Sequence, residues 1–268
     1  MKRFTLVFGL VCSGLVVLSA LVSLFWTPYD PAKVDPPNRY APMSWPHILG
    51  TNSMGMDTAS RLLVGAQTTL VVGVLAVAIA AVVGVPLGVF VGMGHRLAGE
   101  LLGRVADIML AIPALLLAIL LAAALNPSVG TATIAIGVAT IPIFLRMARA
   151  ATLTVMSQDY ILAAEVSGTA RWAIAVRHVL PNIAPLLGVQ AASSFAMAIL
   201  AEAGLSYLGL SAPVTTPTWG RMLRDASLYA APAQAIIPGA AIVIAVMGFN
   251  LLGDGVRDYL DPRLKEVR

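Results

Sequence analysis

Long apolar stretches recur along this chain and restrict the folds that it can adopt. An α-helix needs roughly 20 apolar residues to cross a bilayer. Only 11% of the 268 residues are charged, against about 25% in soluble domains. We therefore predict an all-α polytopic membrane protein with no separate soluble domain. Six transmembrane helices are expected, at residues 5–26, 67–93, 105–125, 131–147, 183–205 and 233–252.

The first apolar stretch is expected to be a retained membrane anchor. It is longer than the roughly 7–15 apolar residues of a signal peptide, and no convincing small-residue cleavage site follows it. The segment 27–66 carries six prolines, so it cannot form one continuous helix. We expect residues 1–66 to form the anchor and an extracytoplasmic segment. Residues 67–268 would form the transmembrane core, with a cytoplasmic loop at 150–182.

Basic residues indicate how the predicted helices are oriented. With the N-terminus inside, the cytoplasmic segments hold twelve Lys and Arg residues and the outside segments hold five. Positive residues collect in cytoplasmic loops, so both termini are expected in the cytoplasm. The inner set is Lys2, Arg3, Arg96, Arg104, Arg146, Arg149, Arg171, Arg177, Arg257, Arg263, Lys265 and Arg268, and the outer set is Lys33, Arg39, Arg61, Arg221 and Arg224.

A polar, arginine-bearing segment, YILAAEVSGTARWAIAVRHVLPN, interrupts the apolar pattern. Ser157 is predicted to cap a short helix over 160–167, and Gly168 suits a left-handed cap at its end. A second short helix is expected over 170–178. The loop would then lie across the inner face of the membrane as two helices joined at a glycine corner.

Two interpretations of this loop are open from its residues. The small residues Ala163, Ala164 and Gly168 form a surface into which a partner could pack closely, as a helix packs into a groove. Alternatively, the segment is an amphipathic helix that rests on lipid headgroups, anchored by Arg171 and Arg177.

The spacing of the loop resembles the "EAA" loop of ABC-importer permeases, where the membrane subunit docks onto a separate ATPase. That loop reads Glu-Ala-Ala, three residues, Gly, nine residues, an apolar residue or His, any residue, Leu and Pro. The positions in register here are Ala163, Ala164, Gly168, His178, Leu180 and Pro181, with Pro181 at a helix boundary or helix start. The motif's glutamate aligns with Leu162. Glu165 lies three residues later on nearly the same helix face, and we hypothesise that it takes over that role. The resemblance assigns these residues, with Arg171, to an ATPase-coupling loop.

Three further segments resemble the dipeptide, oligopeptide and nickel group of these permeases. HILGTNSMGMDTASRLLVGAQTTLVVG, at 47–73, is similar to "LGTDxxGRDxxSRxxxGxRxSLxxG", with Asn52 and Met56 in place of the usual Asp and Arg. AEAGLSYLGLSAPVTTPTWGRML, at 201–223, resembles "AEAxLSFLGLG…PTPSWGxML", and GDGVRDYLDPRL, at 253–264, resembles "GDxLRDxLDPR". The chain is thus similar to the second, "C"-type permease of a peptide/nickel-type importer.

The resemblance implies the type I ABC importer (MetI-like) transmembrane fold in a bacterial inner membrane. The chain would form half of a pathway for peptides, nickel, a metal chelate or a related small solute. Its partners would be a second homologous permease, two ABC ATPase subunits and an extracytoplasmic solute-binding protein, surrounded by membrane lipid and without nucleic acid. ATP and Mg would be bound by the ATPases, so no cofactor is expected in this chain.

Two polar residues in the predicted helices are candidates for the pathway or its gate. Glu202 lies near the outer end of its helix, and intramembrane acids are functional candidates by default, although an interface pairing would also explain it. Asn250 would make an interhelical hydrogen bond or line the pathway.

Neither a catalytic nor a metal site is predicted. The sequence has no HExxH motif and no GxxxxGK[ST] motif, so the chain is not expected to hydrolyse ATP. Its three histidines fall in loops, which argues against an intramembrane Ser/His hydrolase. His47, Met54 and Met56 are close in sequence but fall in a turn-rich loop, whereas a metal site usually needs three or four ligands that further groups hold in place. The alternative function is a self-sufficient secondary transporter or channel, which would need several buried acids where the spans offer only Asp107 and Glu202.

Overall fold

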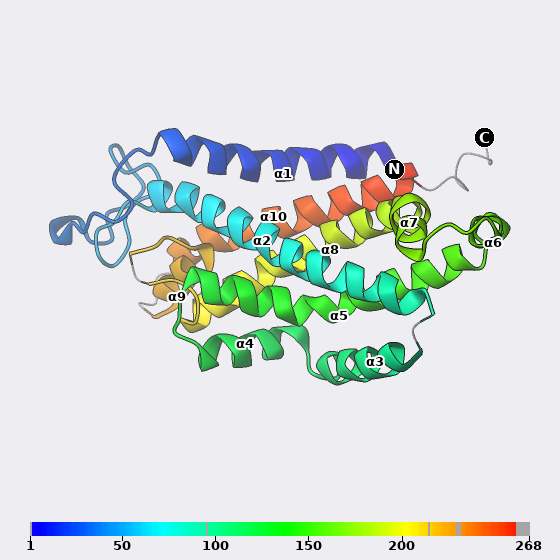
Figure 1. The fold of residues 1–268 in the computed structure, drawn as a ribbon. Coiled ribbons are helices and arrows are strands. Elements are labelled where there is room, and N and C mark those ends of the chain that lie inside the picture. The colour runs from blue at the N-terminus through cyan, green and yellow to red at the C-terminus, as the bar shows by residue number, and fades with distance from the viewer. Residues whose placement is uncertain (1, 95, 214, 229–231, 261–268) are drawn as a thin grey trace.

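The computed structural model describes residues 2–94, 96–213, 215–228 and 232–260, and these form a bundle of long helices with short helices at its two ends (Figure 1). Arg263, Lys265, Arg268 and the end of the 253–264 segment lie outside the described residues. The order is α1 (Lys2–Phe25), a 3₁₀ turn (Pro36–Asn38), α2 (Thr58–Gly92), α3 (Arg96–Ala111), α4 (Ala114–Ala124), α5 (Val129–Met156), α6 (Asp159–Val166), α7 (Arg171–Ile174), a π-helical turn (Ala175–Val179), α8 (Leu180–Leu208), α9 (Trp219–Leu228) and α10 (Pro232–Leu260).

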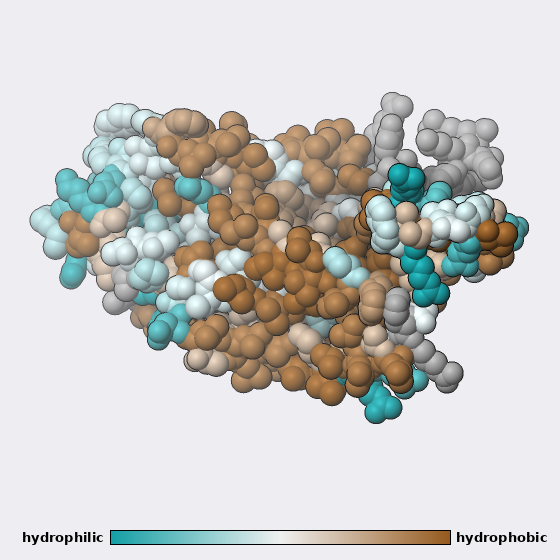
Figure 2. All heavy atoms as spheres, in the orientation of Figure 1, coloured by the Kyte–Doolittle hydropathy of each residue, from teal (hydrophilic) through white to brown (hydrophobic). Residues whose placement is uncertain are grey.

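Five helical segments of the described residues are long and apolar enough to cross a membrane, which confirms five of the six expected spans. They are α1, α2, α5, the continuous segment from α7 to α8, and α10. Figure 2 shows apolar residues over much of the visible face of the bundle and hydrophilic residues gathered at its ends. This is the surface that a protein crossing a bilayer needs.

The sixth expected span, 105–125, is not one helix. It is divided between α3 and α4, whose axes differ by 92°. The break lies at Pro113, which takes an extended backbone (φ −50°, ψ 129°) before α4 begins. Proline lacks an N–H and disfavours helical geometry in the residue before it. The apolar pattern does not show this break. The single helix expected at 105–125 is therefore wrong, and two helices that meet at a bend take its place.

Helix α2 begins nine residues before the expected start at 67, because Asp57 caps it. The Asp57 carboxylate accepts hydrogen bonds from the backbone N–H of Ser60 at 2.8 Å and from its hydroxyl at 2.7 Å. The connecting segment after α1 is therefore 27–57, with only a 3₁₀ turn among its described residues. Residue 66, the expected boundary of the anchor region, lies inside α2.

A glycine stripe lets α2 and α5 approach closely. A Cβ atom on Gly84 would lie 2.8 Å from the Ile141 carbonyl oxygen, and one on Gly88 would lie 2.5 Å from the Leu145 carbonyl oxygen. Both distances are too short for real contacts, so only glycine fits. Small residues are the usual means of close helix packing in membranes.

The described ends of the chain meet at one end of the bundle. The start of α1 lies beside the last described turns of α10, at the end that also carries α6 and α7 (Figure 1). Glycines at the seam between α1 and α10 hold the two helices close: a Cβ on Gly9 would lie 2.8 Å from the Leu252 nitrogen. The opposite end carries the segment 27–57 and α9.

Candidate functional site

The segment 157–182 forms a two-part projection at one end of the bundle. The expected N-cap at Ser157 is wrong: Ser157 ends α5, and its N–H donates to the Leu153 carbonyl. Gln158, with extended backbone, precedes α6 and makes no side-chain cap. Helix α5 continues to Met156, nine residues beyond the end at 147 that the apolar pattern predicted.

Gly168 turns the chain as expected. Its φ of +77° is left-handed, its N–H donates to the Glu165 carbonyl, and the Thr169 N–H donates to the Ala164 carbonyl, each at 3.0 Å. This pair of hydrogen bonds is the Schellman arrangement, which satisfies the last carbonyls of a helix. Because no atom lies within 4 Å of a Cβ built on Gly168, the backbone conformation alone requires glycine here.

The second half of the loop is not a separate short helix. After Gly168 the chain runs without a break from Arg171 through α7, a π-helical turn and α8 to Leu208. The expected end at 178 is therefore wrong. Pro181 is the second residue of α8 and directly follows the π-helical turn. A proline inside a continuous helix removes one hydrogen bond to the preceding turn, and the helix is irregular at this place.

Helix α6 is attached to the bundle by one buried side chain and one polar contact. Ile161 is fully buried in a cluster with Ile174, Val179 and Ile183. Beside it the Asn182 amide donates to the Tyr160 hydroxyl at 3.3 Å and to the His178 carbonyl at 2.7 Å. These contacts fix the orientation of α6 against the start of α8.

The remaining surface of α6 is exposed and carries both apolar and acidic side chains. Leu162 is 54% exposed and Val166 is 90% exposed, and Ala163 and Glu165 are also exposed. The loop residues singled out from the sequence therefore separate into two groups. Ala163, Glu165, Gly168, Arg171 and Pro181 are on the surface, while Ala164, His178 and Leu180 are partly buried. Large apolar side chains that are exposed outside the membrane-spanning helices are common in interaction surfaces.

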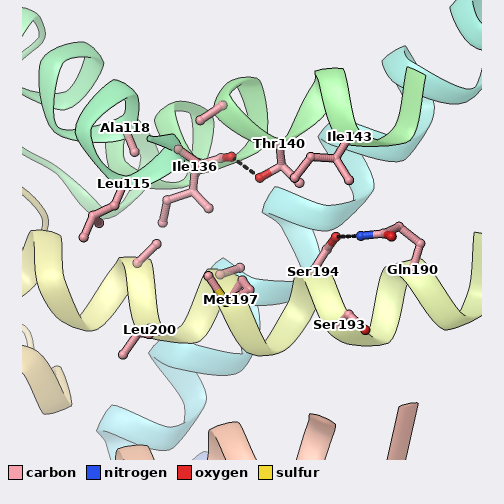
Figure 3. A pocket seen from close by; sticks show the side chains of 14 residues that line it. Leu115, Ala118, Ile136, Thr140, Ile143, Gln190, Ser193, Ser194, Met197 and Leu200 are labelled. Atoms are coloured by element: carbon pink, nitrogen blue, oxygen red, sulfur yellow. Dashed lines mark hydrogen bonds between the residues drawn. The ribbon is translucent and has the colours of Figure 1, made fainter. Parts of the chain in front are cut away.

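A cavity of about 170 Å³ lies among α4, α5 and α8. Figure 3 shows that its half next to Leu115 and Ala118 is apolar, while Thr140, Gln190, Ser193 and Ser194 supply polar groups in the other half. The Gln190 amide donates to the Ser194 hydroxyl at 3.0 Å. This cavity, which forms a groove among the three helices, was not predicted from the sequence. Gln190 and Ser194, two polar residues one helical turn apart within an apolar span, could have indicated it.

Glu202 and Asn250 do not line this cavity. Glu202 is fully buried in α8, and neither carboxylate oxygen has a hydrogen-bond partner among the described residues. Asn250 is partly buried in α10. The structure therefore does not bring the two candidate pathway residues together with the groove.

At the opposite end, a charged cluster joins the segment 27–57 to α9. Arg61 is 1% exposed and donates to the Pro31 carbonyl and to the Met56 sulfur, each at 2.9 Å. Burial raises the pKa of the Asp225 carboxyl, and the guanidinium groups of Arg221, Arg61 and Arg224 act in the opposite direction. The cluster ties the connecting segment to the bundle.

His47 and Met56, two of the residues considered as metal ligands, contact other side chains at this end of the bundle. The His47 ring nitrogen lies 2.9 Å from the Asp57 carboxylate, and Met56 is occupied by Arg61. Within the described ranges, no group of three or more His, Cys, Asp and Glu side chains could hold a metal ion.

Comparison with known proteins shows which family this chain resembles. Residues 84–266 match the family described as "Binding-protein-dependent transport system inner membrane component". The chain is 40% identical to the di/tripeptide transport system permease protein DppC of Pseudomonas aeruginosa, over 97% of this chain and 88% of that protein. It is 40% identical to the dipeptide transport system permease protein DppC of Escherichia coli (97% and 89%) and 39% identical to the probable D,D-dipeptide transport system permease protein DdpC of the same species (94% and 87%).

Proposed function

Because this chain belongs to the family of binding-protein-dependent transport system inner membrane components, we propose that it forms half of the pathway through which an ABC importer takes up short peptides. The family makes it a multi-pass inner-membrane component of a transport system that uses a binding protein. It is a permease and not a catalytic subunit. The proposal that the solute is a peptide is based on the names of relatives that match nearly the whole chain.

The observation that carries the proposal is α6, an exposed helix whose orientation against the bundle is fixed by buried contacts. Ile161 anchors it, Gly168 turns the chain beside it, and Leu162 and Val166 remain uncovered. We assign this surface, with Ala163, to the contact with an ATPase subunit. Two ATPases, each binding ATP and Mg, would serve this chain and a second homologous permease.

The orientation follows from the same assignment. If α6 contacts an ATPase, the end of the bundle that carries α6 is cytoplasmic, and so is the start of α1 beside it. The segment 27–57 and α9 then face outward, where the solute-binding protein delivers its cargo. The arrangement agrees with the distribution of basic residues in the sequence.

The groove among α4, α5 and α8 fits a peptide better than a metal ion. Its polar groups are hydroxyls and amides, which pair with peptide N–H and C=O groups, and no charged side chain lines it. The relatives described above are named for peptides. Nickel, which the sequence resemblance left open, gains no comparable support.

A self-sufficient secondary transporter has less support. Of the two acids that it would use, Asp107 is 65% exposed and lies 3.6 Å from Arg146. Of these two acids only Glu202 is buried within a membrane-spanning helix. A single buried acid gives little support to an ion-coupling site, which would need several.

A cross-linking experiment tests the assignment of α6. Cys12 is buried, so an introduced cysteine reacts selectively. In the assembled transporter we expect Ala163→Cys to cross-link to an ATPase subunit and the matched variant Lys33→Cys, at the other end of the bundle, to give no such product. An ATPase cross-link from Lys33→Cys alone would reverse the proposed orientation.

Glu165→Ala tests the replacement of the missing motif glutamate. Glu165 is exposed and removed from the buried cluster around Ile161, so the fold should be unaffected. We expect peptide-stimulated ATPase activity to fall about fivefold, as when a contact of roughly 1 kcal/mol is lost. Unchanged stimulation would remove Glu165 from the coupling contact and leave the apolar surface of α6 as its basis.

A further inference from the structure

A second, separate groove lies between the inner end of α2 and the segment that follows Gly168. It has a volume of about 400 Å³. Pro86, Val89 and Met93 form its wall on α2, and Arg171, Trp172 and Ala175 form its wall on α7 and the π turn. It shares no residue with the groove among α4, α5 and α8.

The chemistry of this groove is apolar with one cation at its edge. Apart from Arg171, every lining side chain is a hydrocarbon, aromatic or thioether group. The Arg171 side chain is exposed, and its guanidinium makes no hydrogen bond or ion pair within the described part of the chain. No acidic residue lines the groove, so the charge of Arg171 is not compensated there.

The groove opens where the membrane-facing surface of α2 ends. Val82, about one helical turn from Pro86, is 72% exposed, and exposed apolar residues continue along α2 toward the bundle centre. Trp172, at the groove, is 71% exposed. An exposed tryptophan beside an arginine at the end of a transmembrane helix is typical of the headgroup level of a bilayer.

We propose that this groove binds one anionic phospholipid of the inner leaflet, with an acyl chain against Val89 and Met93 and the phosphate on Arg171. The hydrocarbon wall matches the chain and the unpaired guanidinium matches the phosphate, as in basic pockets that hold anionic lipid headgroups on the cytoplasmic side. The inner-leaflet placement rests on the proposed function, since that sets which end of the bundle is cytoplasmic.

The site would connect membrane composition to the loop. Arg171 follows Gly168 by three residues, and the π turn that includes Ala175 leads into α8. A lipid between α2 and α7 therefore holds the segment that positions α6. Removal of the lipid would loosen α6 relative to α2 without changing any residue of the groove among α4, α5 and α8.

The test uses the whole transporter, purified with its partner subunits into nanodiscs of phosphatidylcholine with or without phosphatidylglycerol. Native mass spectrometry reports retained phosphatidylglycerol. We expect Arg171→Gln to reduce retention about fivefold, the effect of one basic residue at the membrane surface. Arg177→Gln removes another exposed charge, one that does not line the groove, and it should change retention little.

Ala175→Leu provides a second variant that fills the groove without altering charge, and it should also lower retention. Equal retention by Arg171→Gln and Arg177→Gln, or retention of phosphatidylcholine as strongly as phosphatidylglycerol, would overturn the lipid site. A structure of the assembled complex in which another subunit covers the groove would also overturn the lipid site. Peptide uptake measured on the same preparations separates the two proposals, because normal uptake without selective lipid retention removes only the lipid site.

Discussion

At the scale of single residues, Glu202 is the most unusual group in the bundle. It is fully buried in α8, and both carboxylate oxygens lack a partner among the described residues. Thr69 of α2 also has a buried hydroxyl without a partner. An ionised carboxylate in such a place is strongly unfavourable unless it is paired. Glu202 is therefore expected to be neutral, or to meet a partner only in the assembled transporter.

Glu202→Gln distinguishes these two states. If the carboxyl is neutral, the amide has nearly the same shape and no ionisable group, so the melting temperature of the transporter should be unchanged or raised by a few degrees. Asp254→Asn, at an exposed position in α10, is the control and should have no effect. A melting temperature lowered by Glu202→Gln alone would show that the carboxylate has a charged partner in another subunit.

At the scale of helices and loops, the sequence predicted those features that depend on local chemistry. Gly168 was predicted because a left-handed cap requires a residue without a Cβ, and α2 and α5 followed from their apolar length. The division of 105–125 was missed because hydropathy does not show whether Pro113 is tolerated, as Pro86 and Pro142 are within their helices. The groove at Gln190 was missed because it exists only where three helices meet.

Gly168→Ala measures how far the loop depends on its turn. A left-handed backbone costs a non-glycine residue about 1–2 kcal/mol, and no steric clash adds to this. We expect the variant to fold normally but to retain less ATPase subunit on purification. Gly168→Asn should retain more than Gly168→Ala, because asparagine tolerates this conformation better. Equal retention by all three forms would contradict the role of the turn.

Gly88→Ala tests the close approach of α2 and α5. The added Cβ would lie 2.5 Å from the Leu145 carbonyl oxygen, so the helices must separate. Overpacking of this kind costs about 1–3 kcal/mol, and thermal unfolding in detergent should occur at a lower temperature. Gly188→Ala in α8 is the control, because nothing lies within 4 Å of its Cβ. Equal stability of both variants would be evidence against the glycine stripe.

At the scale of the whole molecule, the chain is an inner-membrane component of a binding-protein-dependent transport system, and we propose that it forms half of the pathway. Apolar residues cover much of the visible face of the bundle, the exposed helix α6 lies at one end, and the connecting segment lies at the other (Figures 1 and 2). The sequence predicted most of the membrane-spanning helices through their apolar length, whereas the orientation taken from the basic residues and the ATPase contact of α6 stay predictions. It did not locate the lipid groove, because α2 and α7 are about 80 residues apart along the chain and meet only in the fold.

The most direct measurement is a mild-detergent purification of the tagged full-length chain from its native membrane, with mass spectrometry of its partners and an ATPase assay. We predict two ATPase subunits and a second permease in stoichiometric amounts, with ATPase activity that a peptide-loaded binding protein stimulates. Intact, folded chain recovered alone and without ATPase activity would contradict the importer and favour a transporter that acts without partners.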